Sequence, residues 1–210
     1  MDARAWDERY AATELVWSAT PNQFVEAELA ELPPGRALDL AAGEGRNAIW
    51  LAERGWSVTA VDFSQVGLDK GRAIREGHPR AAELRIEWVH ADVTDYHPDD
   101  GANDLALLAY LQVPDGPRRD AVRTAFSALK VGGTFFLVGH DATNLTEGTG
   151  GPQDPDVLYT AEQVLADLDG ERFEVVRAER VARAVTSEDE HRGASRATAY
   201  DALVRLVRTA

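Results

Sequence analysis

Residues that could bind a nucleotide cofactor cluster around a glycine-rich segment early in the chain. Gly43-Glu44-Gly45-Arg46-Asn47-Ala48 fits the pattern G-x-G-x-x-G/A, and Asp62 follows about 20 residues later. Glycines at these positions let backbone N–H groups approach a ligand closely at the N-terminus of a helix. A carboxylate at the end of the next strand can accept hydrogen bonds from both hydroxyls of a ribose. The spacing predicts a nucleotide-cofactor site, which nicotinamide dehydrogenases share with other enzyme classes.

Asp39 narrows the choice of cofactor because it stands inside the strand that leads into the glycine segment. A buried carboxylate lowers stability unless it is hydrogen-bonded or faces a positive charge. A pyrophosphate group gains nothing from this negative charge, whereas a ligand that carries an ammonium and a sulfonium group gains from it. The sequence therefore favours a sulfonium cofactor over a dinucleotide.

Strand-like and helix-like stretches alternate along most of the chain. This alternation predicts a Rossmann-like α/β fold, in which helices cover both faces of a mostly parallel sheet. Seven strands are expected over 37–40, 57–61, 84–89, 105–109, 134–138, 173–184 and 197–207. Helices are expected over 5–11, between Pro21 and Pro33, and over 47–54, 67–76, 118–129 and 160–168.

Two connections late in the chain carry further signals. Val131-Gly132-Gly133 predicts a turn before the fifth strand, and 144–155 is rich in glycine and proline, which is typical of a loop. The last two strands have a short polar connection, so we expect an antiparallel hairpin at the C-terminal end of the sheet.

The composition bounds the number of domains and the compartment. A chain of 210 residues with 44% hydrophobic residues can bury one α/β core and leaves little for a second. We therefore expect a single domain over 1–210, with lid helices over 1–34 and the sheet over 35–210. No apolar run approaches a membrane span and no signal peptide is evident, so a cytoplasmic location is expected.

The charge and the absence of cysteine argue against several function classes. A formal net charge of −14 repels phosphate backbones and anionic lipid headgroups, so we expect neither nucleic acid nor a membrane surface as a partner. The same field mildly disfavours an anionic substrate. Without cysteine there is no disulfide, thiolate nucleophile or cysteine-based zinc site. The five histidines are scattered, and no metal site is predicted.

Several motifs in order resemble those of the class I S-adenosylmethionine-dependent methyltransferases, and the resemblance covers nearly the full chain. The run Leu38-Asp39-Leu40-Ala41-Ala42-Gly43-Glu44-Gly45-Arg46-Asn47 is most similar to the branch of the tellurite-resistance and thiopurine methyltransferases. That branch often has a cysteine where Ala42 stands, a departure that removes no donor the loop backbone cannot supply. The other motifs are Asp62, Asp92-Val93, the strand at 105–109, and the turn Leu129-Lys130-Val131-Gly132-Gly133-Thr134-Phe135 with the hairpin that closes the chain.

The resemblance implies S-adenosylmethionine as the cofactor and assigns residues to its methionine end. Asp39 would help to orient the amino-acid group, although it could be only a structural carboxylate. Ala109 would end the fourth strand beside the transferring methyl group. The loop and helix start would supply the remaining contacts through Ala41, Gly43, Gly45, Arg46 and Asn47.

The resemblance also assigns residues to the adenosine end of the cofactor. Asp62 would hold the two ribose hydroxyls, and Phe63 would lie against the adenine face. Asp92 would accept from the adenine amino group, and the backbone of Val93 would donate to the ring. The alternative is that Asp62 and Asp92 only cap a helix or turn at a strand end.

The fourth strand bears on the methyl acceptor. It lacks an Asn/Asp-Pro-Pro-Tyr tetrad, which removes the main sign of methylation at nucleobase or glutamine nitrogen. The simplest mechanism is in-line displacement by a small nucleophile, at S, Se or Te, O or N, held in position and desolvated. Tyr110 would line the acceptor pocket, and His140, after the fifth strand, is a candidate general base. The alternatives are a packed aromatic ring and a solvated loop histidine.

Two outlying segments complete the expected site. Trp6-Asp7-Glu8-Arg9-Tyr10 resembles the lid of the same branch, in which Tyr10 and Trp17 would cover the cofactor or else fasten a terminal helix to the sheet. The turn of the final hairpin should lie at the carboxyl ends of the parallel strands. His191 and Arg192 in that turn would position the acceptor, unless the turn is only solvated.

The sequence thus predicts an enzyme that transfers a methyl group from S-adenosylmethionine to a small-molecule acceptor, as a monomer or a homodimer. Two alternatives stay open. A non-catalytic S-adenosylmethionine-binding module would bind the cofactor without turnover, and an NAD-dependent oxidoreductase would bind the dinucleotide instead.

Overall fold

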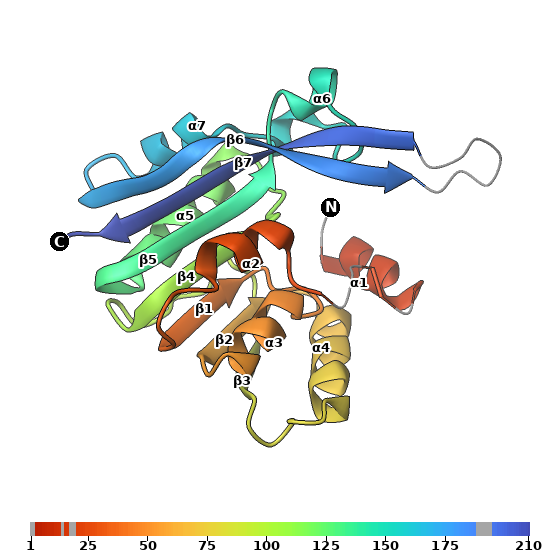
Figure 1. Ribbon diagram of the computed structural model, residues 1–210, viewed down its shortest axis with the longest axis vertical. Coiled ribbons are helices and arrows are strands. Elements are labelled where there is room, and N and C mark those ends of the chain that lie inside the picture. The colour runs from red at the N-terminus through yellow and green to blue at the C-terminus, as the bar shows by residue number, and fades with distance from the viewer. Residues whose placement is uncertain (1–2, 14, 17–19, 188–194) are drawn as a thin grey trace.

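The computed structural model describes residues 3–13, 15–16, 20–187 and 195–210, which form a seven-stranded sheet in the order β3-β2-β1-β4-β5-β7-β6 (Figure 1). Neighbouring strands from β3 to β5 pair in parallel, and β7 pairs antiparallel with both β5 and β6. The predicted Rossmann-like sheet with a C-terminal antiparallel hairpin is confirmed. Its strands are β1 Arg36–Leu40, β2 Ser57–Asp62, β3 Arg85–His90, β4 Asn103–Ala109, β5 Leu129–His140, β6 Phe173–Ser187 and β7 Ser195–Arg208.

Several helices begin at residues whose side chains satisfy the exposed N–H groups of the first turn. Asn22 accepts from Phe24 and Val25 at the start of α2, and Ser64 accepts from Gly67 at the start of α4. The helices in the described residues are α1 Ala3–Ala11, α2 Gln23–Leu29, α3 Arg46–Glu53, α4 Gln65–Gly77, α5 Asp115–Ser127, α6 Asn144–Glu147 and α7 Ala161–Asp167, with a 3-10 turn η1 Pro155–Val157.

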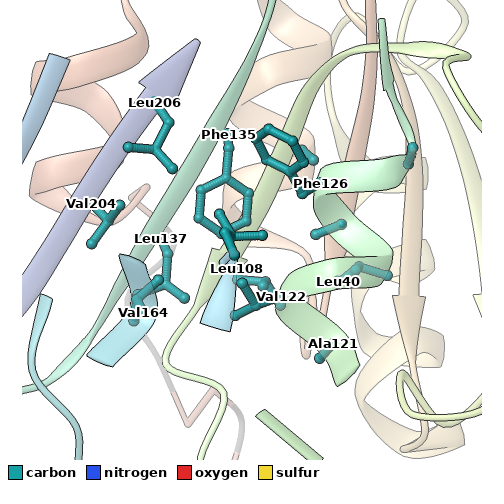
Figure 2. Packing of buried hydrophobic residues seen from close by; sticks show 14 of the residues in the cluster. Leu40, Leu108, Ala121, Val122, Phe126, Phe135, Leu137, Val164, Val204 and Leu206 are labelled. Atoms are coloured by element: carbon teal, nitrogen blue, oxygen red, sulfur yellow. The ribbon is translucent and has the colours of Figure 1, made fainter. Parts of the chain in front are cut away.

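Alternate residues of each strand face opposite sides of the sheet, so the strands contribute to two cores. On one side Leu38 and Leu40 of β1 belong to a cluster with α5 and α7, in which Phe126 packs edge-on against Phe135 (Figure 2). On the other side Ala37 belongs to a cluster with α2 and α3 that includes Leu29. Because the central strands are buried on both faces, their sequences are nearly continuous apolar runs.

The structure corrects the turn predicted at Val131-Gly132-Gly133, which is part of β5. The register shifts here, since Asn103 pairs with Leu129 and Leu105 already pairs with Thr134. The extra residues of β5 form a bulge, and Gly132 has a φ of +84°, which glycine adopts without strain. The glycines therefore bend the strand without ending it.

Two neighbouring predictions also had inaccurate bounds. The helix expected over 118–129 begins at Asp115 and ends at Ser127, because Leu129 is already paired in the sheet. The expected loop over 144–155 contains the short helix α6. None of the helices in the described ranges is long and apolar enough to cross a membrane.

Candidate active site

A cavity of about 490 Å³ opens at the carboxyl ends of β1, β2 and β4, within the roughly 300–1,000 Å³ range of small-ligand sites. Ligands in open α/β sheets bind at this edge. Figure 1 shows α1 at the same end of the sheet. The cavity is lined by residues at or after the ends of β1, β2, β3 and β4 and by Trp6 and Tyr10 of α1.

The glycine loop between β1 and α3 has a backbone that other residue types would not adopt easily. Gly43 and Gly45 have φ angles of +56° and +74°. A Cβ atom at Gly45 would lie 2.3 Å from the ring of Trp88, so only glycine fits there. The prediction that this loop opens a helix is confirmed, with Gly45 at the N-cap of α3.

Asp62 ends β2 and ties the glycine loop to the start of α4. Its Oδ2 accepts from the backbone N–H of Gly43 at 2.8 Å, and its Oδ1 accepts from that of Ser64 at 2.8 Å. Burial is the main cause that raises the pKa of this carboxyl. The capping role and the position on the cavity wall therefore coexist in one side chain.

The residues expected at the adenosine end lie together on the cavity wall. Phe63 follows β2, and Asp92 and Val93 follow β3. Asp92 Oδ1 accepts from the backbone N–H and the hydroxyl of Thr94, at 2.9 and 2.8 Å. The turn chemistry that was the alternative for Asp92 is present, and its contact with adenine stays a prediction.

The residues expected at the methionine end separate into two groups. Ala41, Gly43, Arg46, Asn47 and Ala109 line the cavity. Asp39 and Gly45 do not line it, and Gly45 instead leaves room for a tryptophan ring.

Asp39 is buried beneath the loop, at 1% exposure, and its carboxylate oxygens have no hydrogen-bond partner within the described residues. Burial, followed by the nearby charge of Asp62, raises the pKa of Asp39 to about 8. An unpaired buried carboxyl beside the loop fits a ligand that brings a positive charge.

Two strained backbone positions mark the same cavity. Ala41 and Tyr110 both have a φ of +60° and are the positive-φ residues other than glycine among those described. Such conformations are uncommon for residues with a side chain and cluster at functional sites. Both residues line the cavity, each directly after a strand.

A second cavity of about 630 Å³ adjoins the first and shares Arg46, Tyr110 and Gln112 with it. His140 and Arg183 line only the second cavity. The structure brings together the Tyr110 and His140 side chains, whose rings lie 4.9 Å apart, and their roles toward an acceptor stay predictions.

Asp201 of β7 connects the polar side chains of the second cavity. It is fully buried and accepts from the Tyr110 hydroxyl at 3.0 Å and from Arg183 Nε at 2.7 Å. His140 Nδ1 lies 3.4 Å from its other oxygen. Burial opposes ionisation, but the His140 and Arg183 side chains outweigh it and lower the pKa of Asp201.

The sequence analysis missed Asp201 and Arg183. A signal for Asp201 was present, because it interrupts an apolar strand as Asp39 does, and a buried carboxylate needs partners. Arg183 had no comparable signal among the arginines of β6.

The N-terminal segment lies over the first cavity. Tyr10 is 4% exposed, lines this cavity and has its ring 5.4 Å from that of Trp6. The predicted covering position of Tyr10 agrees with this geometry. Trp17, His191 and Arg192 lie outside the described residues.

Comparisons with known proteins relate this site to one family. Residues 37–133 match the family described as "Methyltransferase domain". A demethylmenaquinone methyltransferase of Clavibacter sepedonicus is 41% identical over 103 residues, which cover 49% of this chain and 40% of that protein. A tRNA 5-carboxymethoxyuridine methyltransferase of Escherichia coli (strain K12) is 29% identical over 127 residues, 59% of this chain and 48% of that protein. The chain thus spans less than half the length of these two relatives.

Among solved structures, TehB from Haemophilus influenzae is similar with a TM-score of 0.70, over 90% of this chain and 63% of that chain. The sequence identity is 16%, so this likeness concerns the fold alone.

Proposed function

We propose that this chain, whose residues 37–133 match a methyltransferase domain family, is a class I S-adenosylmethionine-dependent enzyme that transfers a methyl group to a small-molecule nucleophile. The observation that carries the proposal is the pair of adjoining cavities at the carboxyl ends of the strands. The first has the lining expected for the cofactor, and the second opens beside it at Tyr110.

The first cavity fits S-adenosylmethionine in the chemistry of its donors and acceptors. Asp62 would accept from the ribose hydroxyls, while Phe63, Asp92 and Val93 would surround the adenine. Gly43 and Arg46 would meet the methionine end, above the unpaired carboxyl of Asp39. The cofactor supplies a methyl group on a sulfonium, which a nucleophile can displace in line.

The residues of this chain would contribute to catalysis by positioning the acceptor against the methyl group and by excluding water. Trp6 and Tyr10 of α1 would cover the cofactor, and the covering role expected for Trp17 stays a prediction. Tyr110 lines the passage between the cavities, and His140 is placed to accept a proton from an acceptor that carries one. The expectation from the sequence that His191 and Arg192 position the acceptor stays a prediction.

The acceptor and the setting belong to the same proposal. We expect a small-molecule acceptor that reacts at S, Se or Te, O or N, and a cytoplasmic protein that is a monomer or a homodimer. The net charge of −14 supports a small molecule over nucleic acid, although one relative is named for a tRNA nucleoside. The alternatives are a non-catalytic cofactor-binding module and an NAD-dependent oxidoreductase.

The first test compares thermal stabilisation by S-adenosylhomocysteine with that by NAD. A ligand at 100 times its Kd stabilises a folded protein by about 2.7 kcal/mol, so binding is visible as a higher Tm. Stabilisation by S-adenosylhomocysteine alone is expected. Stabilisation by NAD alone would favour the oxidoreductase. Release of S-adenosylhomocysteine with a panel of thiols, phenols, amines and chalcogen compounds then separates the enzyme from the binding module.

Replacement of Asp62 by alanine tests the cofactor site directly. The variant loses the ribose acceptor and the cap on Gly43, so S-adenosylmethionine affinity should fall by about 1.5–3 kcal/mol, the range for charge-assisted hydrogen bonds. Isothermal titration calorimetry measures the affinity and circular dichroism checks the fold. Asp95→Ala is the matched control, since Asp95 is exposed after β3 and lines neither cavity. An unchanged affinity in folded Asp62→Ala would count against the site.

A further inference from the structure

We infer that the second cavity binds methyl acceptors that carry an oxyanion group, a carboxylate or a phosphate, and that Arg183 binds this group. The inference rests on the proposed function and names the substrate class of its acceptor site. It concerns recognition of the acceptor and leaves open which atom is methylated.

The charge of the cavity wall is the first observation. Three arginines, Arg9, Arg46 and Arg183, line this cavity, and neither aspartate nor glutamate does among the described residues. The chain as a whole carries a formal net charge of −14. A cationic wall in an acidic protein concentrates anionic ligands locally, because close charges in a cavity interact more strongly than screened distant ones.

The second observation is that buried Asp201 fixes the position of the Arg183 guanidinium. Fully buried Asp201 binds Arg183 Nε at 2.7 Å, with Nη2 at 3.5 Å, and also accepts from the Tyr110 hydroxyl. A guanidinium has five N–H donors, and these two contacts leave others for a ligand. The Arg183 guanidinium also lies 5.8 Å from the centre of the Tyr110 ring. A held guanidinium suits two-point binding of a carboxylate or phosphate.

The third observation indicates which of the three arginines binds the anion: Arg183 lies where the acceptor, and not the cofactor, would bind. Arg46 borders both cavities, where it can meet the carboxylate of the cofactor's methionine part. Arg9 lies on α1, with its guanidinium 4.9 Å from the Trp6 ring. Arg183 lines only the second cavity and is absent from the lining of the first.

The test measures binding of matched acids and amides to the protein saturated with S-adenosylhomocysteine. The probes are benzoate with benzamide, cinnamate with cinnamamide and 4-hydroxyphenylacetate with its amide, and phenyl phosphate is compared with the acids. Isothermal titration calorimetry should show each acid that binds to be about tenfold tighter than its amide, the difference expected from a charge-assisted pair. The ratio between phenyl phosphate and the acids distinguishes the two oxyanions.

Three variants test whether Arg183 causes the preference for acids over amides. Arg183→Gln should reduce the acid-to-amide ratio to within about threefold while S-adenosylhomocysteine affinity stays constant, and Arg183→Lys should keep part of the ratio because it keeps the charge. Arg180→Gln is the matched control, since Arg180 stands on the same strand, pairs with Glu147 and lines neither cavity.

Two results would overturn the inference. One is a wild-type protein that binds the amides as tightly as the acids, or binds no acid at millimolar concentration although S-adenosylhomocysteine binds. The other is an acid preference that survives in Arg183→Gln. If Arg183→Gln does not fold, the wild-type ratios and Arg183→Lys still decide. Failure to bind S-adenosylhomocysteine itself would instead refute the proposed function.

Discussion

A single carboxyl group, that of Asp39, shows how burial without a partner changes a residue's protonation in this fold. Burial and the nearby Asp62 raise its pKa to about 8, whereas an aspartate in an unfolded chain has a pKa of about 3.9. The proton is therefore retained at neutral pH in the folded protein. A cationic ligand group beside Asp39 would favour the ionised form, which links this residue to the cofactor cavity.

The first prediction concerns stability as a function of pH. Between about pH 4 and pH 8 the folded state binds more protons at Asp39 than the unfolded state does, so this group's contribution to the free energy of unfolding falls as pH rises. Asp39→Asn removes this dependence. The wild type should lose up to about 1.4 kcal/mol per pH unit relative to the variant in this window. Urea unfolding of both proteins without cofactor measures the difference, and parallel stability curves would contradict the prediction.

At the scale of elements, helix α4 holds α1 over the cofactor cavity. Lys70 of α4 donates to the backbone carbonyls of Tyr10 and Thr13 and pairs with Glu44 at 3.3 Å. Asp7 of α1 accepts from the Ser64 hydroxyl at 2.5 Å. These polar contacts attach α1 at Asp7 and at its C-terminal end, and attachments of this kind open at lower free energy than a packed core does.

The second prediction follows from this attachment. Lys70→Met removes the donors that hold the end of α1, so hydrogen exchange in α1 should become faster and the Kd for S-adenosylmethionine should rise by about tenfold, the effect of one or two lost charge-assisted hydrogen bonds. Exchange measured by mass spectrometry and titration calorimetry test the two effects. Asp69→Asn, at an exposed position of α4, is the control and should change neither. Unaltered exchange in α1 would show that Lys70 does not hold the lid.

The connection between α5 and α7 is of another kind, a buried ion pair. Arg118 Nε lies 2.8 Å from Asp167 Oδ2, and both side chains are 3% exposed. Arg118 also pairs with Asp115, which is 65% exposed. Arg118 therefore forms one ion pair with a buried carboxylate and one with an exposed carboxylate, so the contributions of the two pairs to stability can be compared in one protein.

The third prediction uses this comparison. Asp167→Ala leaves Arg118 buried without its enclosed partner and should lower the free energy of unfolding by about 3–5 kcal/mol. Asp115→Ala removes only the exposed partner and should lower it by about 1 kcal/mol or less. Urea unfolding at neutral pH measures both values. Equal losses in the two variants would mean that burial does not determine the strength of this contact.

The elements themselves were predictable because local patterns specify them. The hairpin follows from its short connection, and β1 to β4 overlap the stretches that the sequence predicts, whereas β5 begins at Leu129, before the expected range 134–138. The bulge in β5 was not predictable, since Gly132 is compatible with a turn or a bulge and pairing with β4 decides between them. Local sequence does not contain that pairing.

At the scale of the whole molecule, the sheet assembles the wall of the second cavity, the proposed acceptor site, from residues far apart in sequence. Tyr110 after β4 and Asp201 in β7 are 91 positions apart and share a hydrogen bond. His140 at the end of β5 and Arg183 in β6 reach the same carboxylate. Most residues that line the first cavity were predictable because they follow sequence motifs, and their contacts with a cofactor stay a prediction. The Asp201 cluster was not, because it depends on β7 lying between β5 and β6.

The last prediction follows from the contact of His140 with Asp201 and concerns His140 as a general base. The ring lines the acceptor cavity with Nδ1 3.4 Å from Asp201, an arrangement that can stabilise an imidazole after it accepts a proton. With a phenol from the acceptor screen, His140→Ala should lower kcat by at least about tenfold, since general-base catalysis contributes roughly 10²–10⁴. With a thiol that is already ionised, the rate should change little, because no proton must leave. Release of S-adenosylhomocysteine measures both rates, and a near-normal rate with the phenol from about pH 6 to pH 9 would leave proximity and orientation as the source of catalysis.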